Sequence, residues 1–336
     1  MSRTSRAATI ALNTLLLIIF CTIAWQHRVV IYLLRQGKGQ LHILMNAVPV
    51  EKFQSQYTVT QRQRENLALI SAIKKYSVDS LDYEPTSNFE SVYNENGVPS
   101  LWVITASQPY SLEPVGWWYP LVGRVTYKGF FDKHLAAREF VSLSGNYDVS
   151  IRPVTAWSTL GWFTDPIMSN VLDRDKGSFC NLLFHELFHA TWYAPGNVDL
   201  DENLADFVAG KATIRFLKND TAAVKKFLVS RSDNEIVRKF MKKTSASLTE
   251  FYDTIINRPD RSELKKRKFS EIARSMKTLP LVNRKKLLAR IRELRSGNAC
   301  FVDFGQYESL QDSLENVFNK IYRGNLKKMV RDLKLE

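Results

Sequence analysis

The stretch FHELFHATWYAPGNVDLDENLADF, residues 184–207, decides how the centre of this chain folds. Its apolar residues recur at helical spacing on both sides of APGN (194–197), where Pro and Gly interrupt the pattern, so we predict two helices joined by a short turn. In the first helix His185 and His189 are four residues apart and share one face, with Glu186 beside them. This HExxH arrangement lets two imidazoles bind one metal ion with a carboxylate near its open position. The alternative is a buried helix whose histidines only form hydrogen bonds.

The second helix supplies the rest of a metal site. A catalytic zinc ion keeps three protein ligands and one open position, and a glutamate from the next helix is a common third ligand. Twelve residues separate His189 from Glu202, which is enough for a short return loop. Asp206, one turn after Glu202, is then placed to accept the outer N–H of a ligating histidine. Asp199 and Asp201 compete as third ligands, but they fit better as residues that cap or stabilise the start of the helix.

These parts favour hydrolysis of a peptide bond. A bound zinc ion lowers the pKa of its water toward neutrality, and Glu186 is placed to take the proton as the water attacks a carbonyl. A second electrophile usually stabilises the oxyanion, and the sequence offers four tyrosines without choosing among them: Tyr127, Tyr193, Tyr252 and Tyr307.

The charge of the chain is unevenly distributed. Of 47 Lys+Arg and 34 Asp+Glu in 336 residues, residues 1–210 hold 17 and 19, whereas residues 211–336 hold 30 and 15, for a net charge of +13. In this C-terminal part apolar residues recur every three or four positions, so the basic residues fit the solvated face of packed helices. We therefore expect no nucleic-acid partner.

Residues 1–27 predict a membrane anchor. Arg3 and Arg6 precede an uncharged stretch, residues 7–26, that is about long enough to cross a hydrocarbon layer of roughly 30 Å. An uncleaved anchor is favoured over a cleaved signal peptide, and a lipoprotein signal over Cys21 is disfavoured because bulky Phe20 precedes it. The expected location is a single-pass, membrane-anchored protein with its catalytic domain periplasmic or extracytoplasmic.

The remaining chain, 28–336, is expected to form one α+β, helix-rich peptidase domain with a small β-sheet. Residues 28–174 contain helices, notably one capped at Thr60, and strands at 100–108, 122–130 and 147–154. Residues 175–218 contain the metal-binding helices, and residues 219–336 the basic helices. Cys180 and Cys300 could form a disulfide if both face an oxidising compartment.

Three segments carry a family resemblance: TAWSTLGWFTDPIMSN (155–170), FHELFHATWY (184–193) and DENLADFVAG (201–210). Together they resemble the predicted zinc aminopeptidase family of Gram-negative bacteria, a gluzincin-type HExxH family. The resemblance implies a zincin-like fold, one Zn²⁺ ion held by His185, His189 and Glu202, and Glu186 as catalytic base. The chain departs from the family pattern at Asp201 and Asn203, where Asn and a small residue are usual.

The sequence therefore favours a zinc-dependent peptidase, with an aminopeptidase activity implied by the resemblance and a peptide or protein as substrate. An exopeptidase also needs a group for the substrate amine, for which Asp165 is a candidate that would serve equally in a turn before Pro166. Two alternatives stay open: a metal-binding protein without turnover, and a membrane-tethered interaction protein that uses its basic helices.

Overall fold

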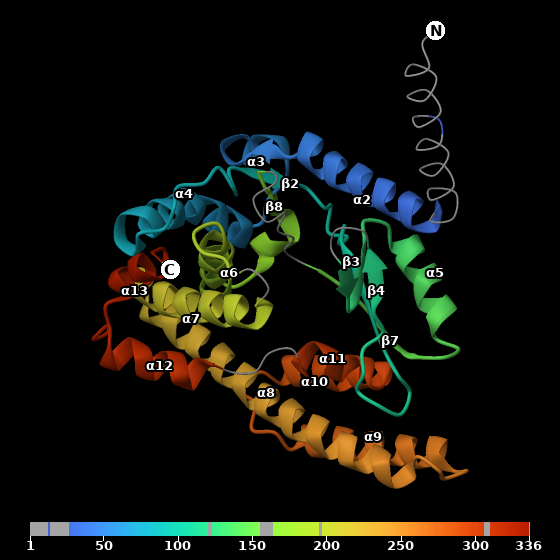
Figure 1. Ribbon diagram of the computed structural model, residues 1–336. Helices are drawn as coiled ribbons and strands as arrows, with labels where there is room; N and C mark the ends of the chain where they lie inside the picture. Colours follow the sequence, from blue (N-terminus) through green and yellow to red (C-terminus); the bar gives the residue numbers. More distant parts are fainter. Residues whose placement is uncertain are drawn as a thin grey trace, which may run out of the picture.

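The computed structural model describes Asn13 and residues 27–119, 123–154, 164–194, 197–305 and 310–335. Within them the chain is a helix-rich α+β fold with three small sheets, as predicted for its class (Figure 1). The helices are α2 (His27–Asn46), α3 (Val50–Gln56), α4 (Gln61–Leu81), α5 (Lys133–Leu143), η1 (Ser169–Asp173), α6 (Lys176–His189), α7 (Val198–Phe216), α8 (Thr221–Ile255), α9 (Arg261–Lys277), α10 (Arg284–Glu293), η2 (Leu294–Ser296), α11 (Ala299–Gly305), α12 (Gln311–Lys320) and α13 (Leu326–Leu333). The strands are β1 (Val48–Pro49), β2 (Ser91–Tyr93), β3 (Trp102–Ser107), β4 (Trp117–Tyr119), β5 (Gly123–Val125), β6 (Tyr127–Phe130), β7 (Asp148–Pro153) and β8 (Ile167–Met168).

The sheet β6-β3-β7 contains the predicted strands at 100–108 and 147–154 and the second half of the one at 122–130, whose first half is β5 in another sheet. β3 lies between β6 and β7, antiparallel to both, with Ile104 opposite Lys128 on one side and Ile151 on the other. Every residue from Val103 to Ser107 is buried, because α5 and α11 both pack against this strand. A strand covered in this way shows a continuous apolar run instead of alternation.

The prediction of a single small sheet is wrong, because the described residues form three sheets. A second sheet, β1-β2-β8, and a two-stranded pair, β4-β5, accompany the first one in the described residues. Strands of two or three residues are too short to show the alternation that identifies a strand in a sequence. The zincin-like part of the fold prediction is not confirmed by these elements.

The β1-β2-β8 sheet fixes the start of the central helices. β2 pairs in parallel with β8, which leads through η1 directly into α6. The Glu95 carboxylate accepts hydrogen bonds from the backbone N–H groups of Ser100 and Asn170, at 2.8 and 3.1 Å, and burial raises the pKa of this carboxyl. These hydrogen bonds link the segment after β2 to η1, which leads into α6.

The predicted helix after Thr60 is confirmed. The Thr60 side chain accepts from Gln63 N–H, and the Gln63 side chain accepts from Thr60 N–H, so two orphan donors are satisfied together. The helix runs on to Leu81 and ends at Asp82, whose φ of 65° is left-handed. Its buried face, including Leu67, Ile70 and Ile73, packs against α6.

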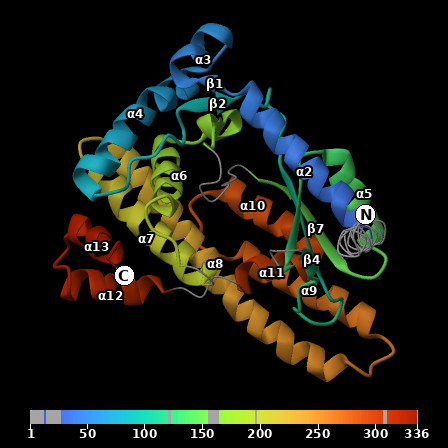
Figure 2. The same ribbon diagram turned by 45° about the horizontal axis from the view of Figure 1, so that its top comes forward.

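Helix α8 connects the two halves of the molecule. Its 35 residues span about 50 Å at 1.5 Å per residue. Near its start Phe227 packs against Gly177 of α6, and its later turns pack against α9 and α11 (Figures 1 and 2). Side chains of α8 therefore pack against both the central helices and the basic C-terminal helices.

The apolar core likewise contains separate clusters for the central helices and for the basic C-terminal helices. The largest cluster surrounds α6, where Phe179, Phe184 and Phe188 are fully buried, and it extends from Ile43 to Val330. A second cluster joins the end of α8 to α9, α10 and α11. Cys180 belongs to the first cluster and Cys300 to the second, and both are free, so these two cysteines do not form the disulfide that was considered.

The prediction of an N-terminal transmembrane helix and a membrane-anchored location is wrong on the evidence of the structure. Residues 1–27 lie outside the described residues except for Asn13 and His27. In the part of the chain that the structure describes, no helix combines the length and apolar character needed to cross a membrane. α2 has the length, but Arg35 and Lys38 lie within it, and charged residues are costly at the bilayer centre.

Candidate metal centre

The HExxH residues lie in α6, whose ends are determined locally. Asp175 caps the helix by accepting from Ser178 N–H, and the helix ends after His189. Residues of the opposite face are buried in the main core, which leaves His185 and His189 on the face toward α7. The prediction that a helix ends before APGN is thus confirmed.

Helix α7 starts at Val198 and is capped by Asn197, whose side chain accepts from Leu200 N–H. The prediction that Asp199 or Asp201 is the cap is therefore wrong. Both aspartates lie in the first turn, where their charge favours the positive end of the helix dipole. α7 packs along α6 and turns Glu202 toward the two histidines.

The three predicted ligands come together. One donor atom from each of His185, His189 and Glu202 lies within 4.8 Å of the others. The two Nε2 atoms are 3.1 Å apart, Glu202 Oε2 lies 3.3 Å from His185 Nε2, and Glu202 Oε1 lies 3.6 Å from His189 Nε2. Donor atoms on a tetrahedral zinc ion at roughly 2.0–2.1 Å are separated by about 3.3 Å. The donor set and its spacing therefore fit one such ion.

The electrostatics of the site favour a cation. Burial alone lowers the pKa of His185, but Glu202 and the neighbouring carboxylates outweigh it and raise this pKa overall. Burial alone raises the pKa of Glu202, but His185 outweighs it and lowers this pKa. The histidine and the carboxylate thus stabilise each other's charged forms. A metal ion bound at the same atoms can supply the positive charge instead.

Glu186 stands next to the ligands without being part of the cluster. Burial raises the pKa of its carboxyl, while the charges of His185 and His189 oppose the rise. Asp165, which is 3% exposed, adds to the rise because its charge repels a second carboxylate. A half-buried carboxyl with a raised pKa beside a candidate metal centre has the character of a general base.

Two further charged residues act on Glu186: Asp165, which the sequence suggested as a candidate, and Arg174, which it did not. The guanidinium of Arg174 lies close enough for the two charges to interact, and burial lowers the pKa of Arg174 while Glu186 raises it. Arg174 directly precedes Asp175, the cap of α6. Asp165 belongs to the segment before β8, and its backbone N–H donates to Asn88 Oδ1 at 3.0 Å. Only the pairing of β8 with β2 brings these residues to the site.

The carboxylate next to the second histidine is Asp201, not Asp206. Asp201 is buried, and its Oδ2 lies 3.4 Å from His189 Nδ1. Among the described residues His189 Nδ1 has no hydrogen-bond partner within normal distance. A proton on Nδ1 directed at Asp201 leaves the lone pair of Nε2 for a metal ion, which is the usual arrangement of a ligating histidine.

Asp206 instead forms an ion pair across the cavity. Its two oxygens accept from Arg231 of α8 at 3.3 and 3.0 Å. A Cβ at Gly210 would lie 2.7 Å from Arg231 Nη1, so the glycine leaves room for this guanidinium against α7. Asp206 still acts on the metal centre through space, because its charge raises the pKa of His185.

Two other histidines and the four candidate tyrosines lie elsewhere or outside the described residues. His42 and His134 line a separate surface cavity, and Tyr252 donates a hydrogen bond to Asn298 in the second core. Tyr127 and Tyr193 are largely exposed, and Tyr307 lies outside the described residues. The structure thus places none of the described tyrosines in contact with the three ligands.

The metal centre opens into a cavity of about 510 Å³ between α7 and α8. His185 of α6 and Glu202, Asn203 and Asp206 of α7 line it together with residues of α8 and with Gln311 of α12. This volume suits a short peptide segment.

The fold and the site define a class: a helix-rich α+β protein with a His-His-Glu cluster that could hold a metal ion on two neighbouring helices. A family model described as "Putative aminopeptidase" (Aminopep) matches residues 31–334 of the chain. The protein therefore belongs to this family, which supports the aminopeptidase part of the resemblance stated above. No curated protein and no solved structure matches the chain.

Proposed function

We propose that this protein is a zinc-dependent aminopeptidase that acts on peptide or protein substrates. The observation that carries the proposal is the convergence of His185, His189 and Glu202 on one point, with half-buried Glu186 beside them. A purely structural site has no use for a fourth, non-ligating carboxyl group of this kind. The family to which the chain belongs supports a peptide substrate with a free amino terminus.

Three ligands leave a fourth coordination position for water or substrate. A zinc ion in this site would supply Lewis acidity toward the substrate carbonyl and the attacking water. His185 and His189 hold their Nε2 atoms toward this point, and Asp201 orients the second ring through Nδ1. Fixed ligands of this kind need little rearrangement when the reaction occurs.

Glu186 moves the proton. Its carboxylate takes a proton from the attacking water and gives it to the amine that leaves, which returns the carboxylate to its starting state. The raised pKa favours this exchange, because a base works best when its pKa lies near the working pH. The apolar side chains of α6 under the site limit the access of further water.

An aminopeptidase must also recognise a positively charged amine next to the scissile bond. Asp165 is the candidate that the structure supports, because it is buried and its charge acts on Glu186. A buried carboxylate is a strong partner for an ammonium group, since the low dielectric strengthens their attraction.

The proposal is tested with the purified full chain loaded with one equivalent of zinc. We expect hydrolysis of peptides with a free amino terminus, and little or none of the same peptides after N-acetylation. Glu186→Gln should bind zinc normally but lose about 10²- to 10⁴-fold in kcat, the usual contribution of a general base. Glu250→Gln, an exposed acid on α8, is the matched control. Full activity of Glu186→Gln would refute the mechanism, and equal cleavage of acetylated peptides would refute the aminopeptidase assignment.

A further inference from the structure

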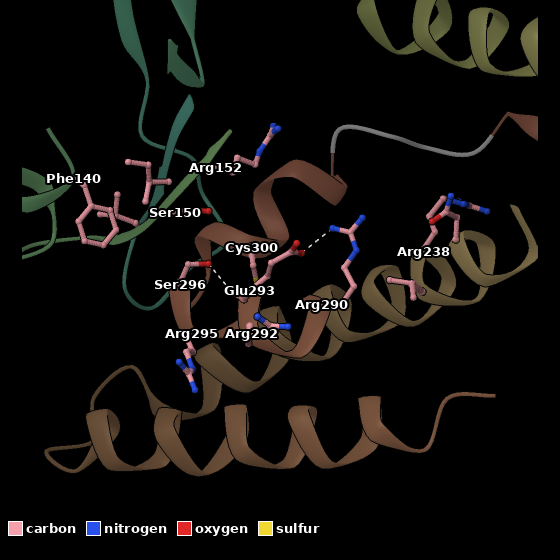
Figure 3. A pocket seen from close by; sticks show the side chains of 14 residues that line it. Phe140, Ser150, Arg152, Arg238, Arg290, Arg292, Glu293, Arg295, Ser296 and Cys300 are labelled. Carbon is pink, nitrogen blue, oxygen red and sulfur yellow. Dashed lines mark hydrogen bonds and ion pairs between the residues drawn. The ribbon is translucent and has the colours of Figure 1, made fainter. Parts of the chain in front are cut away.

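A second cavity adjoins the cavity of the metal centre and is lined by arginines. It has a volume of about 810 Å³ and lies between β7, α8, α10 and η2 (Figure 3). We call it the arginine pocket, after the five side chains that line it: Arg152, Arg238, Arg290, Arg292 and Arg295. They come from three parts of the sequence that lie far apart, namely β7, α8 and the consecutive elements α10 and η2, so only the fold assembles them.

The floor of the arginine pocket is apolar. Val149 and Ile151 of β7, Val237 of α8 and Phe140 of α5 contribute to it, together with Cys300. An apolar floor under a charged rim is the usual composition of a site for an extended organic ligand. The surface of a helix that is only solvated has no such enclosed floor.

Positive charge exceeds negative charge in this pocket. Glu293 is the only acidic residue that lines it in the described part of the chain, and it accepts from Arg290 at 2.7 Å. Arg238 is held by Glu235 through two bonds, at 2.8 and 2.5 Å. A guanidinium has five N–H donors, so one arginine can pair with more than one carboxylate, and these ion pairs fix where an incoming carboxylate would bind.

The arginine pocket adjoins the metal cavity along α8. Asn234 and Arg238 line both cavities. Arg231, which pairs with Asp206 at the metal centre, lies seven residues before Arg238, a separation of about 10 Å along a helix. An extended peptide covers roughly 3.3–3.6 Å per residue, so about three residues bridge this distance.

We propose that the arginine pocket binds a carboxylate of the peptide substrate, about three residues beyond the scissile bond on its C-terminal side. This inference rests on the proposed peptidase function and names the preferred substrates as acidic or short peptides. An aminopeptidase holds only one residue on the amino side, so the rest of the substrate extends away from the metal centre in the other direction. Arg152, Arg238 and Arg290 line the pocket from β7, α8 and α10 (Figure 3).

The carboxylate has two sources, an acidic side chain or the C-terminus of a short peptide, and four probes separate them. Ala-Ala-Ala-Glu-amide carries only the side-chain carboxylate, Ala-Ala-Ala-Gln with a free C-terminus carries only the terminal one, and Ala-Ala-Ala-Gln-amide carries neither. Ala-Ala-Ala-Lys-amide reverses the charge. Alanine 4-nitroanilide is too short to reach the pocket and measures the metal centre alone.

The test compares the zinc-loaded wild type with Arg152→Gln/Arg290→Gln. We expect KM to be about tenfold lower for a carboxylate probe than for the neutral amide, with similar kcat, because binding remote from the reacting bond is uniform. The lysine probe should have the highest KM. The double variant should lose the preference while keeping wild-type activity on alanine 4-nitroanilide.

A matched control and a direct binding measurement complete the test. Arg284→Gln/Lys285→Gln removes the same charge from exposed positions of α10 that do not line the pocket, and it should keep the preference. Calorimetric titration of zinc-loaded Glu186→Gln with the glutamate and glutamine amides should show the same tenfold difference in Kd. Equal KM for all four peptides with equal Kd for the two titrated amides, or a preference that the control variant also loses, would overturn the pocket assignment. Absence of all hydrolysis with tight, arginine-dependent binding of the carboxylate probes would instead overturn the proposed peptidase function.

Discussion

The metal centre and the arginine pocket share helix α8 but are built in opposite ways. The metal centre gathers acidic and imidazole groups from α6 and α7, and His189 and Asp201 are almost fully buried there. The arginine pocket gathers basic groups from four elements, and Arg152, Arg292 and Arg295 are largely exposed. Burial fixes geometry, whereas exposed side chains can adjust to a ligand. The comparison suggests that the chemical step depends on the first region and the choice of substrate on the second.

The largest effect is expected from the loss of a metal ligand. His189→Ala should abolish stoichiometric zinc binding and lower hydrolysis of alanine 4-nitroanilide by about 10³-fold or more, because metal catalysis contributes several kcal/mol. Zinc analysis and steady-state kinetics measure both effects. His134→Ala, at the separate surface cavity, should leave them unchanged. A His189→Ala protein that keeps one zinc and its activity would remove the metal centre from the catalytic role.

The next effect separates the two aspartates of α7. Asp201→Asn should weaken zinc binding about 10- to 100-fold, because Asp201 orients His189 through Nδ1. Asp206→Asn should weaken it less, since Asp206 pairs with Arg231 and acts on His185 only through space. Competition for zinc with a chelator of known affinity measures the difference. The reverse order of the two variants would assign the orienting role to Asp206.

A smaller effect is expected where α6 rests on α8. A Cβ at Gly177 would lie 2.6 Å from Phe227 Cβ, so Gly177→Ala forces the two helices apart. Such overpacking costs typically about 1–3 kcal/mol of unfolding free energy. Gly145→Ala, where the added Cβ meets nothing within 4 Å, is the control. Urea denaturation measures both, and equal midpoints for the two variants would show that the contact between α6 and α8 is not tight.

The smallest effect on stability belongs to the arginine pocket. Arg152→Gln/Arg290→Gln should change the unfolding free energy by no more than about 1 kcal/mol, because exposed ion pairs contribute little. Its zinc affinity should equal that of the wild type. Thermal melts with and without zinc check this, and a large loss of stability would mean that these arginines hold the fold together instead of serving a ligand.

The parts of the molecule that the sequence could predict are those set by short-range patterns. The spacing of His185, His189 and Glu202 sufficed to group the ligands, and Thr60 with Gln63 sufficed for the start of α4. Short-range spacing could not identify which carboxylate lies beside His189. Asp201 and Asp206 are both in reach along the sequence, and only the packing of α7 on α6 turns Asp201 inward and Asp206 toward Arg231.

Features that join distant segments could not be predicted. The β2-β8 pairing connects residues 91–93 with 167–168 through two or three residues each, too few for a periodic signal. The arginine pocket combines residue 152 with residues 238 and 290–295, so the basic helices appeared as a solvated surface when considered alone. The single sheet and the transmembrane helix were wrong, the first because short strands leave little trace in a sequence and the second because hydropathy over residues 7–26 was its only basis.

The most direct test of the account is a zinc titration of the metal-free full chain in which bound zinc and peptide hydrolysis are followed together. The account predicts that both rise in parallel and reach their plateau at one zinc per chain, with Glu186→Gln showing the same binding curve and almost no hydrolysis. Hydrolysis without zinc, or one tightly bound zinc without any hydrolysis in the wild type, would contradict it.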